Sequence, residues 1–121
     1  ADLTQSAKDF ALLDHTGKFH QLSYYGDQRG VVLYSHGVAY SGANSDIDRF
    51  EKLQSEYSDD QVVFFMINAF LQDSRDSIAA QMKNKEARVS VLLDETQIVS
   101  RDLAITRLGE VLVIDGAYTA R

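Results

Sequence analysis

The chain of 121 residues contains no cysteine and no proline. Without cysteine it holds no disulfide, and it cannot supply the thiolate that nucleophilic thiol chemistry requires. At an average usage of about 5%, a chain of this length would carry about six prolines. Biased lineage composition, engineered removal and an indirectly inferred sequence all remain open as explanations of the two absences.

The chain also lacks the signals of several ligand classes. It has no apolar run of the roughly 20 residues that a membrane span needs. Its net charge of −6 argues against nucleic acid or an anionic membrane as the main partner. Phosphate loops and dinucleotide fingerprints are absent. His15, His20 and His36 form no metal-binding pair, and the first two are interpreted as surface residues beside a turn. We therefore expect no cofactor and no metal.

What is present is typical of one globular domain. Hydrophobic residues make up 45% of the chain and charged residues 25%, which are ordinary values. No repeat or linker divides it, so we expect a single domain over residues 1–121. The first residues are Ala1 and Asp2 rather than methionine, which favours an exported, periplasmic protein. A cytoplasmic protein is the alternative.

Short apolar runs bounded by turn residues predict the strands. These runs cover residues 10–13, 18–22, 31–35, 62–67, 89–93 and 111–114. The first two should form a hairpin, because Asp14-His15-Thr16-Gly17 places glycine late in the turn, where a positive φ is needed. Residues 24–30 are interpreted as a loop.

Apolar residues three and four positions apart predict a helix over residues 43–57. The residues on its buried face are Ala43, Ile47, Phe50, Leu53 and Tyr57, whereas Asp46, Asp48 and Glu51 are interpreted as a solvated face. Asp73 or Ser74 should cap a second helix with Ile78 and Met82 inward. A short helix over 96–103 should bury Ile98, Val99 and Leu103. Because strands and helices alternate, we expect an α/β fold whose mostly parallel sheet is covered on both faces.

From residue 7 to residue 116 the sequence resembles the redoxin family, which includes peroxiredoxin-like and thioredoxin-like proteins. The order and spacing of several short segments carry the resemblance. These segments are residues 9–14, 16–18, 21–23, 31–34, 62–68, 73–75, 92–95 and 113–115. The resemblance implies a thioredoxin-like fold with a mostly parallel central sheet, helices on both faces and an N-terminal β-hairpin.

The residues that carry the family's chemistry do not match. By the resemblance, the nucleophilic cysteine at the start of the helix after the first parallel strand falls on Tyr40. The second cysteine of a two-cysteine motif falls on Ala43, and the cis-proline before the last core strand falls on Gly109. These three positions therefore form a degenerate redox site with no catalytic residue.

Neighbouring residues leave two interpretations of this region open. Ser41 would need an adjacent base to act as a nucleophile, and only His36 is near in sequence, so we expect Ser41 to cap the helix instead. Tyr40 either fills the volume of the missing thiol or contacts a ligand or partner. The candidate binding residues are His36, Tyr40, Ser41 and Leu108.

These residues leave three functions open. The chain is interpreted as a binding or accessory subunit of a larger assembly, with a protein partner. The alternative is a thiol peroxidase or thiol–disulfide oxidoreductase whose cysteines are absent only from this version, and a third, metal-binding reading would use His36 and Tyr40. The resemblance also implies a further strand and helix after residues 114–116, which we expect this chain to lack. A second contact surface would then lie near residues 113–121.

Overall fold

The main sheet has four strands in the computed structural model, which describes residues 9–115. They are β3 (Gly30–Ser35), β4 (Val62–Asn68), β5 (Ser90–Leu93) and β6 (Val111–Asp115). The order across the sheet is β5-β4-β3-β6, and only β6 runs antiparallel to its neighbour. The prediction that these segments share one sheet is confirmed, with small shifts at the strand ends.

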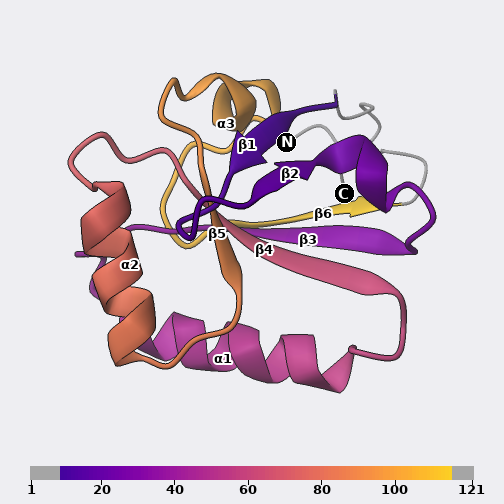
Figure 1. Ribbon diagram of the computed structural model, residues 1–121, viewed down its shortest axis with the longest axis horizontal. Helices are drawn as coiled ribbons and strands as arrows, with labels where there is room; N and C mark the ends of the chain where they lie inside the picture. Colours follow the sequence, from indigo (N-terminus) through magenta and orange to yellow (C-terminus); the bar gives the residue numbers. More distant parts are fainter. Residues whose placement is uncertain (1–8, 116–121) are drawn as a thin grey trace.

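One face of the sheet is covered by α1 (Ala43–Glu56) and α2 (Arg75–Asn84). In Figure 1, α1 lies below the sheet and α2 stands at its left end. The buried residues between them are Tyr34, Ile47, Phe50, Phe64, Met66, Ile78, Met82, Val89 and Val91. The predicted inward positions Leu53 and Tyr57 were wrong, because these side chains are 43% and 46% exposed.

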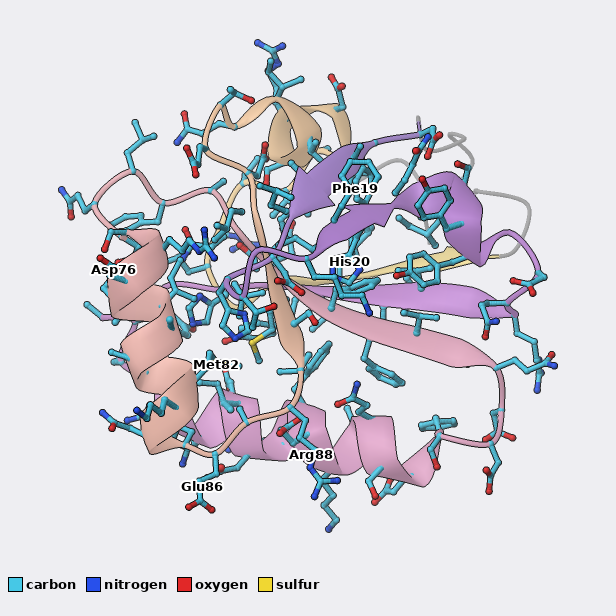
Figure 2. All side chains as sticks on the ribbon, viewed as in Figure 1. Phe19, His20, Asp76, Met82, Glu86 and Arg88 are labelled. Atoms are coloured by element: carbon cyan, nitrogen blue, oxygen red, sulfur yellow. The ribbon has the colours of Figure 1, made fainter. Side chains whose placement is uncertain are left out.

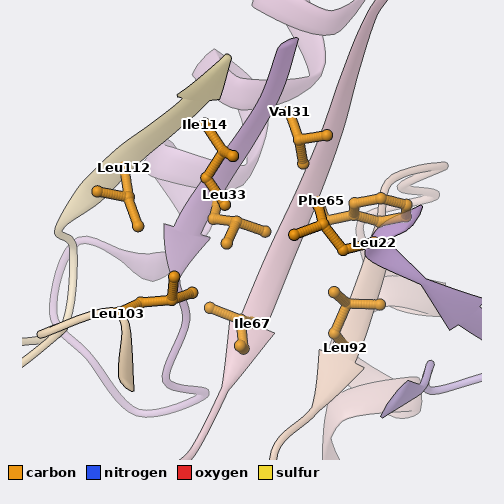
Figure 3. Packing of buried hydrophobic residues seen from close by; sticks show 9 residues of the cluster. All are labelled: Leu22, Val31, Leu33, Phe65, Ile67, Leu92, Leu103, Leu112 and Ile114. Atoms are coloured by element: carbon orange, nitrogen blue, oxygen red, sulfur yellow. The ribbon is translucent and has the colours of Figure 1, made fainter. Parts of the chain in front are cut away.

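The other face is covered by the hairpin of β1 (Ala11–Leu13) and β2 (Phe19–Gln21), by the 3-10 helix η1 (Leu22–Tyr25) and by the short helix α3 (Ile98–Asp102). Figure 3 shows the core on this side. Its buried residues are Leu22, Val31, Leu33, Phe65, Ile67, Leu92, Leu103, Leu112 and Ile114. Two predictions fail here. The 3-10 helix Leu22–Tyr25 takes in residue 22, predicted as the end of a strand, and residues 24 and 25, predicted as part of a loop. Ile98 is 47% exposed because so short a helix buries only one side.

The histidines beside the hairpin turn are more enclosed than the sequence interpretation has them, since His20 is buried and His15 is half-buried. His20 is buried, and its Nε2 lies 2.7 Å from Oδ2 of the equally buried Asp14. His20 points from β2 into the molecule in Figure 2. The backbone N–H of His15 donates to the Val91 carbonyl, and its ring Nδ1 accepts from the Val91 N–H. The turn thereby pairs with the outer edge of β5, leaving this edge no open hydrogen bonds at Val91.

The acidic residues of α1 are also more than a solvated face. The Glu51 carboxylate accepts the backbone N–H groups of Arg88 and Val89 at 2.6 and 3.1 Å, and Asp48 pairs with Lys85. These contacts fasten α1 to the segment between α2 and β5. At the start of α2 the predicted cap is confirmed as Ser74, whose hydroxyl accepts the Ser77 N–H in a capping box.

The far edge of the sheet is β6, where Val111 and Val113 are 54% and 39% exposed. The remainder of the predicted second contact surface, residues 116–121, lies outside the described residues. None of the helices described is long and apolar enough to cross a membrane.

Candidate functional site

The degenerate redox positions lie where β3 leads into α1 and where a turn leads into β6. Tyr40 stands in the loop before α1 and is 38% exposed. A β-carbon added to Gly109 would lie 2.9 Å from the Tyr40 hydroxyl oxygen, and one added to Gly42 would lie 3.3 Å from Cε2 of the same ring. The ring therefore occupies a slot that exists because both glycines lack side chains.

The turn into β6 is held in a conformation that suits glycine. Gly109 has a φ of +80°, which other residues adopt only with strain. Its N–H donates to the Ser35 carbonyl at 2.8 Å, and the Ser35 N–H donates to the Glu110 carbonyl. Leu108 packs beside Gly37, where an added β-carbon would come within 2.8 Å of Cδ1 of Leu108. The structure thus brings Tyr40, Leu108 and Gly109 to one place on the surface.

The other predicted site residues are divided between the surface and the interior. Ala43 is buried as the first residue of α1, and its N–H donates to the Tyr40 carbonyl. Ser41 is exposed and does not cap the helix, so that expectation was wrong. The N-cap residue is Gly42, which offers no side-chain acceptor.

His36 lies fully buried at the end of β3, within a polar cluster that the sequence did not predict. Its Nδ1 accepts from the Asn68 amide at 3.1 Å, and its Nε2 lies 2.7 Å from Oε1 of Gln81. The same Asn68 amide group donates to Asp73 Oδ2, which also accepts the Val38 N–H. The cluster ties the loop before α1 to β4 and to α2.

These hydrogen bonds determine what His36 can do chemically. Because the Asn68 amide nitrogen can only donate, Nδ1 must accept, and the ring proton sits on Nε2 facing Gln81. Both ring nitrogens are therefore engaged, and His36 cannot serve as a base for Ser41. Burial lowers the pKa of His36, against the opposing influences of the Gln81 hydrogen bond and the Asp73 charge. His36 acts as a neutral anchor of the loop that carries Tyr40.

Sequence reasoning missed the partners of His36. Ser74 is the cap of α2, and the carboxylate of Asp73, the other candidate cap, instead accepts hydrogen bonds from Val38 and Asn68. The available signal was Asn68 itself, a polar side chain directly after the apolar run of β4. At the end of a parallel strand such a residue commonly faces the loops of the neighbouring strands.

No group of three or more histidine or acidic side chains within residues 9–115 is arranged to hold a metal ion. His36 and Tyr40 also do not meet, since both nitrogens of His36 face Asn68 and Gln81. The metal-binding reading therefore has no geometric support in this part of the chain.

Comparison with known proteins agrees with this architecture. The profile of the AhpC/TSA family matches residues 3–118. The chain belongs to the AhpC/TSA family. This AhpC/TSA chain contains no cysteine anywhere in its sequence. No curated protein matches the chain.

Many solved structures share the fold at low sequence identity. A hypothetical protein from Sinorhizobium meliloti 1021 is 18% identical with a TM-score of 0.87, covering 99% of this chain and 68% of its own. The peroxidoxin BcpB from Mycobacterium tuberculosis is 21% identical with a TM-score of 0.82, covering 98% and 81%. A secreted disulfide oxidoreductase from M. tuberculosis, homologous to E. coli DsbE, is 11% identical with a TM-score of 0.78, covering 93% and 80%. These likenesses confirm the thioredoxin-like fold.

The buried cluster predicts a pH dependence of stability. Because the pKa of His36 is lowered in the folded chain, protonation favours the unfolded chain, whose histidine titrates near 6.5. Stability should therefore be full above about pH 6.5 and fall as the pH drops towards the folded pKa. An NMR titration of the His36 ring protons, with urea unfolding at pH 7.5 and 5.5, measures both quantities. A His36 pKa at or above 6.5 would contradict the prediction.

His15 must be separated from this effect, because burial lowers its pKa as well. The variant His36→Gln removes one titrating group and should reduce the loss of stability between the two pH values. His15→Gln is the matched comparison, and the two reductions should not simply add, because the charge on His15 is itself one of the causes that lower the pKa of His36.

Proposed function

We propose that this chain is a thiol-free AhpC/TSA domain that binds a protein partner, as an accessory subunit of a larger assembly. The observation that supports it most directly is the position of the Tyr40 ring. A large amphipathic ring, 38% exposed, lies against Gly42 and Gly109, at the position that the resemblance assigns to the family's nucleophile. Tyrosine presented from a rigid support is a typical interface residue.

The surroundings of Tyr40 support recognition more than chemistry. The anchors of its loop, His36, Asn68 and Asp73, are all hydrogen-bonded to one another or to the backbone. This arrangement reduces the ordering cost when a partner docks. The docking surface of the proposal consists of Tyr40, Ser41 and Leu108. The exposed valines of β6 offer a second contact.

The alternative is a thiol enzyme whose cysteines are missing only from this version of the sequence. We expect no peroxidase or disulfide reductase turnover from the chain as given, since both reactions need a thiolate. Steady-state assays with hydrogen peroxide or an aromatic disulfide, and a dithiol reductant, measure this against a heat-treated control. Turnover above that control that survives repeated purification would contradict the expectation.

Binding is tested on material isolated from cells that make the protein naturally. We expect wild type to migrate as a complex larger than 13.5 kDa in size exclusion with light scattering. Tyr40→Ala should weaken the complex about thirtyfold, the effect of losing a central interface tyrosine. Tyr24→Ala, which removes a 64% exposed ring on η1, is the matched control and should leave the complex intact.

A monomer at high concentration, unchanged by Tyr40→Ala, would leave the proposal without support. If Tyr24→Ala and Tyr40→Ala weakened the complex equally, the interface would not be centred on Tyr40, and the proposal would be contradicted. The exported, periplasmic location belongs to the same proposal, and its support is the secreted oxidoreductase among the structures of similar fold.

A further inference from the structure

A cavity of about 590 Å³ opens at the carboxyl ends of β3 and β4, beside Leu108. The connections from β3 to β5 run over one face of the sheet through α1 and α2, whereas the connection from β5 to β6 crosses the other face through α3. The chain thus reverses direction across the sheet at β3. Crevices at this kind of reversal are the usual ligand sites of α/β sheets, and the volume lies within the range of small-molecule sites.

The polar lining of this cavity suits an anion. Arg101 and Arg107 both line it, together with the hydroxyl residues Thr96, Ser100 and Thr106. Aspartate and glutamate are absent from its lining, although the whole chain carries 18 acidic residues and only 12 lysines and arginines. Neither guanidinium forms an ion pair with any residue in the range 9–115. Two uncompensated guanidinium groups on one cavity provide donors for a carboxylate.

Ser35 and Gln97 complete the polar lining, and the apolar wall includes Phe70, Ile105 and Leu108. An inorganic anion would leave this wall in contact with water. A carboxylate attached to an apolar body would satisfy the guanidinium groups and cover the apolar wall at the same time.

The cavity walls are held in an unusual backbone conformation. Gln97 and Ala104, which flank α3, have φ values of +64° and +57° and both line the cavity. Backbone strain of this kind collects at functional sites. Hydrogen bonds hold this wall in place. The buried Asp94 carboxylate accepts the N–H groups of Val99 and Ser100. The side-chain amide of Gln97 donates to the Ala69 carbonyl.

From these observations we propose that the cavity binds a small organic acid, a carboxylate with an apolar body, through Arg101 and Arg107. Tyr40 does not line the cavity, although Leu108 belongs both to the cavity lining and to the proposed docking surface. Binding of the acid is measured on the isolated chain and needs no protein partner, so the two proposals can succeed or fail independently.

Titration of the isotope-labelled chain with 3-phenylpropionate tests this site. We expect saturable shifts of the backbone amides in residues 96–108, by NMR, and no comparable binding of the uncharged 3-phenylpropionamide or of inorganic phosphate. The double variant Arg101→Gln/Arg107→Gln should bind 3-phenylpropionate about tenfold to a hundredfold more weakly, as expected for lost charge-assisted hydrogen bonds. Arg49→Gln, which removes a guanidinium from the exposed side of α1, is the matched control and should bind like wild type.

Three results would overturn the proposal. One is the absence of saturation at about 10 mM acid, a limit corresponding to very weak binding. Another is equal affinity for 3-phenylpropionamide, which would show that the charge is not recognised, or equal affinity for phosphate, which would show that the apolar body is not recognised. The third is unchanged affinity in the double variant when its amide spectrum shows that it is folded.

Discussion

Replacing Asp14 with alanine is expected to lower the free energy of unfolding by about 3 to 5 kcal/mol, because several donors around a buried carboxylate would lose their acceptor. The Asp14 side chain is buried and accepts four hydrogen bonds. Oδ1 accepts from the Thr16 N–H, the Thr16 hydroxyl and the Lys18 N–H, and Oδ2 faces His20 Nε2 at 2.7 Å. Alanine would leave the His20 ring and two backbone donors without acceptors. Urea unfolding at pH 7 measures the loss.

The pH dependence of wild type provides an independent check on Asp14. Burial alone would raise the pKa of this carboxyl group, but the hydrogen bonds from Thr16, His20 and Lys18 outweigh burial and hold the pKa well below its usual range. The stabilisation is therefore fully present above about pH 4 and is lost as the pH falls further towards the folded pKa. The free energy of unfolding of the Asp14→Ala variant should therefore fall less steeply than that of wild type as the pH drops below about 4.

Asp9 is the matched control for Asp14. It also accepts backbone hydrogen bonds, from Phe10 and Ser23, but it is exposed. Asp9→Ala should cost much less, because water replaces the lost acceptor. Equal losses from Asp9→Ala and Asp14→Ala would show that burial of the Asp14–His20 pair is not what makes it important.

Placing proline at position 109, as the family resemblance would have it, is expected to cost about 3 kcal/mol or more. Gly109 has a φ of +80°, whereas proline requires a φ near −65°. Proline would also remove the N–H that donates to the Ser35 carbonyl. The backbone at position 109 is therefore adapted to glycine and not to proline. Thermal and urea unfolding of Gly109→Pro measure the loss.

Gly109→Ala separates the two causes, because alanine keeps the N–H and introduces only the strain and the contact with Tyr40. We expect it to cost about 1 to 2 kcal/mol. The double variant Tyr40→Ala/Gly109→Ala should show that the two single losses are not additive, since the ring and the new β-carbon would compete for one space. Full stability of Gly109→Pro would refute the fit between Tyr40 and Gly109.

The sequence by itself determined the layout of the fold. The strands could be predicted because buried parallel strands require apolar runs such as 62–67, and α1 could be predicted because its apolar residues recur at helical spacing. The absence of cysteine excluded thiol chemistry without any structure. These inferences succeeded because each depends on residues close together in the chain.

Only the tertiary structure decided where the polar residues lie and what they contact. His36 meets Gln81 across 45 positions, and Val91 meets His15 across 76. Nothing in the local sequence distinguishes these histidines from surface ones. A polar side chain can be buried wherever distant segments supply its hydrogen bonds. Likewise, the position of the Tyr40 ring depends on Gly109, which comes close to the ring only when β6 pairs with β3. Periodicity therefore revealed the layers, whereas the site depends on which strand ends and turns the folded sheet brings together.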